Sequence, residues 1–322
     1  MTGFQVECSA AVNGSGIVAL QTENIFQPVN AFVHFVNPDG SVRAGTSGNT
    51  DVHLLGRLSS FVGVSSAQPG RPAWAPESWD AQGNLASTGP SRLGVPTIVE
   101  DPLGGMAVLV REPPAAVENY DELGRLRWRV ELSPELGPGG GFAVDRLGNT
   151  FVMGDGANKA VMGQWIDHDG AAKTAFQLFG PQNEWNHIEG KATARVDSGL
   201  FIRADAWWQL ESLQTSATPA PAWFVAAQPD GLAGVQLVRG GRAYGLIGFP
   251  AGDGCASTVE VFSPSGKSCG KVSFSSGPGA CFWAIGSIGY DGTFVQRVPP
   301  PAGSCEGNEC SCNWRWWTAF FR

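Results

Sequence analysis

The sequence has little positive charge and few charged residues of any kind. Its 322 residues include 21 Lys and Arg against 29 Asp and Glu, which gives a formal net charge of −8 at pH 7. Nucleic acids and anionic membrane surfaces bind proteins that concentrate positive charge on one surface. We therefore expect no nucleic-acid partner and no binding to anionic lipid.

Long apolar runs are also missing. No run approaches the roughly 18 residues that a transmembrane helix needs, so we expect no membrane span. Residues 1–8 lack the basic and apolar regions of a secretory signal peptide. Two locations remain open: a mature secreted, cell-surface or periplasmic chain whose leader is absent, and a cytoplasmic protein.

Motifs for metals and cofactors are lacking as well. The sequence has no His-x-x-x-His or His-Glu pair for zinc and no Asp-x-Asp-x-Asn loop for calcium. The glycine-rich run at 137–141 precedes an expected strand and not a helix, so it does not predict a phosphate-binding loop. We predict no cofactor.

Cysteines are concentrated near the end of the chain. Cys8 stands alone, and the other six fall in the last seventy residues. Crowded cysteines in Gly-, Pro- and Ser-rich segments favour disulfides formed in an oxidising compartment. A thiolate metal site and free thiols are the alternatives, although the segment lacks paired Cys-x2-Cys motifs. The disulfide candidates are Cys255, Cys281, Cys305, Cys310 and Cys312.

Glycine, proline and aromatic residues are plentiful, and they follow a repeat. The 44 Gly, 22 Pro, 12 Trp and 18 Phe residues suit many short strands joined by turns. One class of glycine-centred turn recurs at intervals of about 45 residues, and a second class alternates with it. The first class is centred on Gly40, Gly83, Gly124, Gly170, Gly231 and Gly266. The second class is centred on Gly14, Gly104, Gly148, Gly199 and Gly292, with weaker members near residues 56 and 250.

This alternation predicts an all-β fold, a single β-propeller over residues 1–322. Seven repeats of about 46 residues match the length of a four-stranded blade, so we expect seven blades, with six as the alternative. The stretch at 126–132 alternates apolar and polar residues as an outer strand should. We expect a Cys-rich loop at 303–312 and an aromatic closing strand at 313–322. Closure by pairing strands from opposite ends of the chain is the usual arrangement.

Two segments carry a family resemblance. VDRLGNTFVMG, at 144–154, resembles the VDxxGNxYVxG signature of bacterial seven-bladed propeller repeats and, more distantly, the NHL repeat. YDELGRLRWRVEL, at 120–132, is similar to the DxxGxxxW half of those repeats and of quinoprotein-like propellers. The resemblance spans about residues 10–300 and implies an architecture, not an activity.

The richest candidate binding loop lies at 180–190, between the expected fourth and fifth blades. It gathers carboxylates, amides, an indole and an imidazole, which suit stacking on a sugar or on an apolar group of a partner. The alternative is a solvated loop whose Trp caps a blade edge. The candidate residues are Glu184, Trp185, Asn186, His187 and Glu189.

Two further loops should lie on the same face, because they join the second and third strands of their blades. Asp155 and Asn158 belong to this loop of the fourth blade, and Arg111 belongs to that of the third. We also interpret 207–221 as an enlarged loop of the fifth blade.

Two functions are compatible with these features. The first is a non-catalytic, secreted or surface-exposed propeller that binds a protein or glycan, alone or as a component of a larger assembly. The alternative is a hydrolase or lyase in which Glu184, Glu189 or Asp155 acts as acid or base on a glycan or small molecule. Propellers host both classes, so the fold alone does not decide between them.

Overall fold

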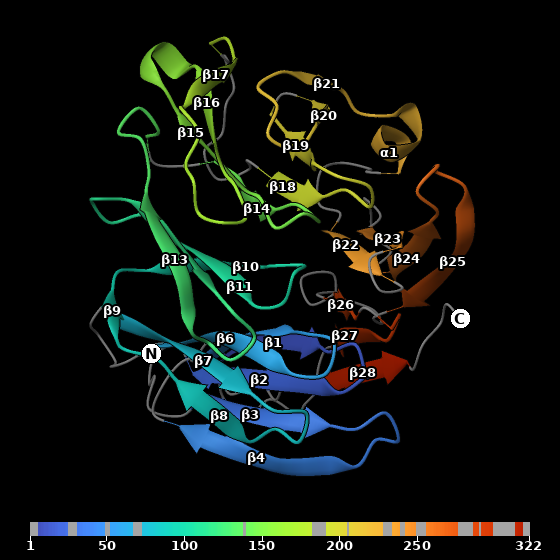
Figure 1. The fold of residues 1–322 in the computed structure, drawn as a ribbon. Helices are drawn as coiled ribbons and strands as arrows, with labels where there is room; N and C mark the ends of the chain where they lie inside the picture. The colour runs from blue at the N-terminus through green and yellow to red at the C-terminus, as the bar shows by residue number, and fades with distance from the viewer. Residues whose placement is uncertain are drawn as a thin grey trace, which may run out of the picture. The chain divides into compact units, whose positions relative to one another are not determined.

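The computed structural model is almost entirely β-structure (Figure 1). It describes residues 6–24, 31–48, 52–66, 73–137, 140–181, 191–204, 206–227, 234–238, 242–248, 256–275, 286–289, 291–298 and 313–317. These residues form one short α-helix, α1 (Ala222–Ala226), and one 3₁₀ turn, η1 (Ala157–Lys159). The remaining regular elements in this part of the chain are strands.

The chain divides into two compact units, which we describe separately. The first comprises Met1–Leu93, Glu122–Gly124 and Gln228–Arg322. Its early strands are β1 (Val6–Val12), β2 (Val18–Asn24), β3 (Ala31–Val36), β4 (Val42–Gly48), β5 (Val52–Gly56), β6 (Phe61–Ser66), β7 (Ala73–Trp79), β8 (Leu85–Thr88) and β9 (Arg92–Leu93). Its late strands are β22 (Gly234–Val238), β23 (Ala243–Gly248), β24 (Ala256–Phe262), β25 (Ser268–Ser275), β26 (Gly286–Ile288), β27 (Phe294–Val298) and β28 (Asn313–Trp317).

The second unit comprises Gly94–Asp121 and Arg125–Ala227. Its first strands are β10 (Pro96–Glu100), β11 (Met106–Val110), β12 (Ala116–Tyr120) and β13 (Leu126–Glu131). They are followed by β14 (Phe142–Val144), β15 (Thr150–Asp155), β16 (Val161–Ile166), β17 (Phe176–Phe179), β18 (Lys191–Ala194), β19 (Leu200–Arg203), β20 (Trp207–Leu210) and β21 (Ala217–Pro219).

These strands form seven antiparallel sheets, each built from consecutive strands, as the turn repeat predicts. We call them blades 1 to 7: β1–β4, β5–β9, β10–β13, β14–β17, β18–β21, β22–β25 and β26–β28. Blade 2 gains a fifth strand because β9 also pairs with β7, and blade 7 has three strands among the described residues. The predicted all-β class and seven-bladed organisation are confirmed.

Blades 1 and 7 pack together without sharing a sheet in the described residues. Residues 313–317 of the aromatic run near the C-terminus form β28, which pairs with β27 in blade 7, and residues 318–322 lie outside the described part of the chain. The expected pairing of strands from opposite ends is not found among the described residues, because β1 hydrogen-bonds β2 and belongs to blade 1. Instead, Val12 and Val18 of blade 1 pack on Val295 and Trp314 of blade 7. Side-chain packing therefore joins these two blades.

Apolar side chains fill the spaces between neighbouring blades of each unit. Within the second unit, β14 lies beside β10 and β18. The core between blades 3 and 4 contains Ala107, Leu109, Val117, Leu136, Phe142, Val144, Val152 and Ile166. The core of blades 4 and 5 contains Ala143, Phe151, Met153, Val161, Trp165, Leu200, Ile202 and Leu210. Because strands in a blade are covered on both faces, β11 and β14 are buried throughout, which explains their apolar sequences. β12 is also buried throughout, and its two polar side chains, Glu118 and Asn119, are hydrogen-bonded to Arg129 and Asp101.

The predicted hairpin turns are largely correct. Gly83, Gly124 and Gly170 each lie between the third and fourth strands of a blade with positive φ, which glycine adopts without strain. The predicted turn at Gly231 lies outside the residues that the structure describes. The weaker predicted turn near residue 250 also lies outside them, and in the first hairpin of blade 6 Val238 pairs with Ala243.

We expected residues 207–221 to be an enlarged loop, but this segment contains the outer hairpin of blade 5. β20 and β21 pair across a turn in which the Gln214 N–H donates to the Glu211 carbonyl. This turn has no glycine, and Leu213 instead takes the left-handed conformation with φ of 59°. A search for glycine-centred turns therefore missed it. Trp207 is buried, as expected for a residue of the blade core.

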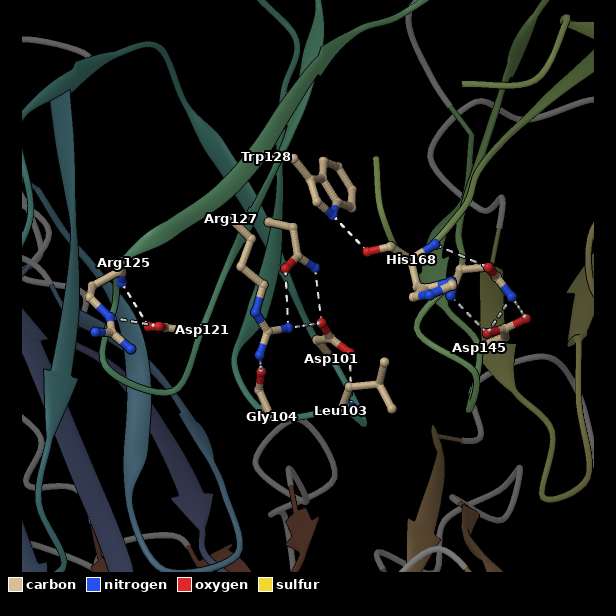
Figure 2. A network of polar contacts seen from close by, with 11 residues as sticks. Asp101, Leu103, Gly104, Asp121, Arg125, Arg127, Trp128, Asp145 and His168 are labelled. Carbon is tan, nitrogen blue, oxygen red and sulfur yellow. Dashed lines mark hydrogen bonds and ion pairs between the residues drawn. The ribbon is translucent and has the colours of Figure 1, made fainter. Parts of the chain in front are cut away.

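A second type of contact links the outer parts of neighbouring blades. The indole N–H of Trp165 in blade 4 donates to the Gln214 carbonyl in the outer turn of blade 5, at 2.8 Å. Trp128 in blade 3 makes the same kind of bond to His168 in blade 4, at 3.0 Å (Figure 2). Gly170 lies against Trp128, and a Cβ there would be 2.7 Å from the indole. Glycine is thus required for conformation and for packing at this turn.

Glu77 is a buried carboxyl group in blade 2, and it makes one stability prediction possible. Its side chain is 7% exposed, and Oε1 accepts the hydroxyl of Ser65 at 2.7 Å. Burial raises the pKa of Glu77, and the hydrogen bond from Ser65 only partly opposes this. The folded state therefore binds more protons than the unfolded state between the two pKa values. Stability is expected to fall as pH rises through this window.

Glu77→Gln is expected to remove this part of the pH dependence. Relative to the wild type, the variant should gain on the order of 1 kcal/mol in free energy of unfolding between pH 4 and pH 8. Urea unfolding at intervals across this range measures the difference. If the free energies of unfolding of the two proteins change equally with pH, ionisation of buried Glu77 does not destabilise the folded state.

Candidate functional site

Three of the residues predicted to bind lie on two equivalent loops of the second unit. Arg111 follows β11 in the loop to β12, and Asp155 ends β15 before the loop to β16. Asn158 lies within η1, where it has φ of 58°. Both loops join the second and third strands of their blades, as expected. The predicted residues Glu184, Trp185, Asn186, His187 and Glu189 lie outside the residues that the structure describes.

A pocket of about 590 Å³ opens between the loop ends of blades 3 and 4. This volume falls within the range of about 300–1,000 Å³ that is typical of ligand sites. The lining residues come from β11, the β11–β12 loop, the end of β13, the following connector and β15. They are Leu109, Arg111, Pro113, Pro114, Ala115, Leu132, Ser133, Pro134, Leu136, Gly137, Val152 and Met153.

The connector from blade 3 to blade 4 is held in place by hydrogen bonds that its backbone N–H groups donate. The Gly137 N–H donates to the Asp155 carbonyl at 2.7 Å, and the Ser133 N–H donates to Oε1 of Gln164 at 2.9 Å. A Cβ on Gly137 would lie 2.6 Å from the Asp155 carbonyl oxygen, so only glycine allows this approach. Residues 133–137 of the connector therefore form a fixed wall of the pocket.

The sequence analysis missed this connector. It is a Pro- and Gly-rich segment, SPELGPGG at 133–140, directly after an outer strand. That composition marked a loop, but nothing in it showed that Pro134 and Leu136 would face Pro113 and Pro114. Arg111 was identified because it lies on a loop of the predicted binding face. Asp155 and Asn158 do not line the pocket.

Two charged residues, Arg111 and Glu112, lie beside the pocket, and only Arg111 lines it. Arg111 lines it and donates to the Gly140 carbonyl, whereas Glu112 points to the start of β10, where Oε1 accepts the Val95 N–H at 2.8 Å. Arg111 is the only ionisable residue among those lining the pocket. The site therefore combines an apolar interior with a single cation at its mouth.

A polar network occupies the opposite ends of the same strands. Asp101 accepts bonds from Asn119 and Arg127, and Arg127 also donates to the Gly104 carbonyl (Figure 2). In blade 4, Asp145 accepts the backbone N–H of Leu147 at 2.8 Å. Asp101 and Asp145 are 1% and 0% exposed, so these carboxylates fix turns and are closed to a ligand.

One set of side chains in this network, Ser212, His168 and Asp145, contains the residue types of a hydrolase triad. Its geometry does not match a triad, because the Ser212 hydroxyl donates directly to Asp145 at 2.5 Å. The imidazole of His168 instead approaches Asp169, with 3.4 Å between Nε2 and Oδ2. A triad needs the imidazole between the hydroxyl and the carboxylate. The set therefore joins blades 4 and 5 structurally.

The cysteines predicted to form disulfides lie outside the described part of the chain. They are Cys255, Cys281, Cys305, Cys310 and Cys312, whereas Cys269 is an exposed free thiol. Among the described residues, no group of three or more His, Cys, Asp or Glu side chains is arranged to hold a metal ion. None of the helices in this part of the chain has the length and hydropathy to cross a membrane.

No protein-family model and no curated protein matches the sequence. Solved structures do match the fold. The β-propeller domain of the Trilobed protease from Pyrococcus furiosus, described as having an open velcro topology, is similar with a TM-score of 0.56 and 9% identity. The match covers 92% of this chain and 91% of that one.

Two further structures show the same likeness. Sqt1 of Saccharomyces cerevisiae matches 99% of this chain and 83% of its own, with a TM-score of 0.51 and 10% identity. An S511A mutant of puromycin hydrolase, complexed with PGG, matches with a TM-score of 0.52 and 14% identity. That match covers 92% of this chain but 50% of the hydrolase. By its seven meander sheets and these likenesses, the chain is a seven-bladed β-propeller.

Proposed function

We propose that this chain is a binding module that presents the loop ends of blades 3 and 4 to a protein partner. The observation that carries the proposal is the apolar pocket beside Arg111, walled by a rigid connector and by Pro113 and Pro114. Apolar pockets with few polar groups are typical sites for the anchor residues of a partner. The crowded cysteines support a secreted or surface-exposed location, although cytoplasmic residence is the alternative.

A protein partner fits the described surface better than a glycan. Sugars are bound by aromatic faces with many hydrogen-bonding groups, and the pocket lining is dominated by aliphatic residues and prolines. The residues that suggested glycan binding, Trp185 and its neighbours, lie outside the described part of the chain. Glycan binding, membership of a larger assembly, and the hydrolase or lyase alternative therefore remain predictions.

Filling the pocket tests the proposal. Dodecapeptides displayed on phage are selected on the immobilised protein, and synthetic copies of the enriched peptides are measured by fluorescence polarisation. Ala115→Trp and Ser133→Phe place bulk in the pocket, because both residues line it. Each variant is expected to weaken peptide binding by about tenfold or more, which corresponds to about 1.4 kcal/mol.

The matched control is Glu135→Ala. Glu135 is exposed on the same connector but does not line the pocket, so this variant should bind as the wild type does. Thermal unfolding shows whether the filled variants keep their fold. Failure to enrich any peptide, or wild-type affinity in both folded filled variants, would contradict a binding role for this pocket.

A further inference from the structure

The pocket beside Arg111 restricts the chemistry of what it can bind. Its base is formed by Leu109, Val152 and Met153, which are each no more than 3% exposed. Pro113, Pro114 and Pro134 form its exposed wall. Proline has no backbone N–H, so this wall provides no backbone donors to a polar ligand. The body of the ligand is therefore expected to be apolar.

Arg111 adds one charged contact at the mouth. Glu112, the next residue, is not part of the lining, and its carboxylate accepts the backbone N–H of Val95. A guanidinium has five donors in a planar fork, and it can bind a carboxylate while keeping a contact to a backbone carbonyl. One cation beside an apolar pocket matches one carboxylate beside an apolar group.

We propose that this pocket binds a peptide segment in which a bulky apolar or aromatic side chain lies next to an Asp or Glu. The apolar side chain enters between blades 3 and 4, and the acidic side chain pairs with Arg111. This inference rests on the proposed binding function and specifies the partner's chemistry. A single cation on a chain of net charge −8 suits one carboxylate and not a polyanion such as nucleic acid.

Reversing the charge at residue 111 tests whether Arg111 selects an acidic peptide. The dodecapeptide selection is repeated on Arg111→Glu, and the recovered sequences are compared with those from the wild type. We expect wild-type selections to enrich an aromatic residue adjacent to Asp or Glu, and Arg111→Glu selections to replace the acid with Lys or Arg. In polarisation assays, changing the acid of the best wild-type peptide to its amide should weaken binding by about tenfold.

Two controls separate a local ion pair from general electrostatics. Lys159→Glu reverses an exposed cation on the equivalent loop of blade 4, outside the pocket lining, and should leave the peptide preference unchanged. Arg111→Ala should bind the acidic peptide and its amide equally. If filling the pocket blocks binding but Arg111→Glu changes neither preference nor affinity, the acidic-peptide inference fails and the binding role stands. If no peptide is enriched, both fail.

Discussion

Replacing Trp165 with alanine is expected to lower the free energy of unfolding by about 3–5 kcal/mol. The indole is fully buried between blades 4 and 5, and its ring centroid lies 4.8 Å from that of Phe151. Truncation leaves a cavity and removes the donor to the Gln214 carbonyl. Urea unfolding followed by circular dichroism measures the loss.

Two related variants divide this effect into its parts. Trp165→Phe keeps an aromatic ring but removes the indole N–H, so it should cost about 1–3 kcal/mol. Trp128→Ala removes an indole that makes the same type of bond to the next blade but is only half-buried. It should cost less than Trp165→Ala. Equal losses at Trp165 and Trp128 would show that burial does not set the contribution of these contacts.

The sequence predicted this fold well because each blade repeats the same local solution. A hairpin whose turn needs a positive φ selects glycine, so Gly124, Gly170 and Gly266 are visible in the sequence at regular spacing. The prediction was wrong where another residue adopted that conformation, as Leu213 does in blade 5. There, the hairpin was interpreted as an enlarged loop because its turn had no glycine.

The candidate site was predicted less completely, for a different physical reason. Topology alone places Arg111 on a loop between the second and third strands, so its position could be inferred from the repeat. The pocket depends on how the connector of blade 3 packs on β15, through bonds such as that from Gly137 to Asp155. Such contacts join residues distant in sequence, and no local pattern encodes them.

Two equivalent turns of blade 4 differ in burial, and we expect burial to decide how much each turn contributes to stability. Asp145 and Asp167 occupy equivalent positions in two Asp-x-x-Gly turns of blade 4, and each carboxylate accepts backbone N–H groups of its own turn. Asp145 is fully buried and also receives the hydroxyl of Ser212 in blade 5. Asp167 lies nearer the surface, where water can replace lost hydrogen bonds.

Asp145→Ala is therefore expected to cost about 3 kcal/mol or more, because it leaves several buried donors without an acceptor. Asp167→Ala is the matched control, since it breaks the same local motif at the surface, and it should cost about 1 kcal/mol. Ser212→Ala should recover part of the loss when added to Asp145→Ala, because it removes one donor that the first substitution leaves unpaired. Denaturant unfolding measures all four variants. The wild type, Asp145→Ala, Ser212→Ala and the double variant form a double-mutant cycle. Similar losses for Asp145→Ala and Asp167→Ala would contradict the assignment of Asp145 as a link between blades 4 and 5.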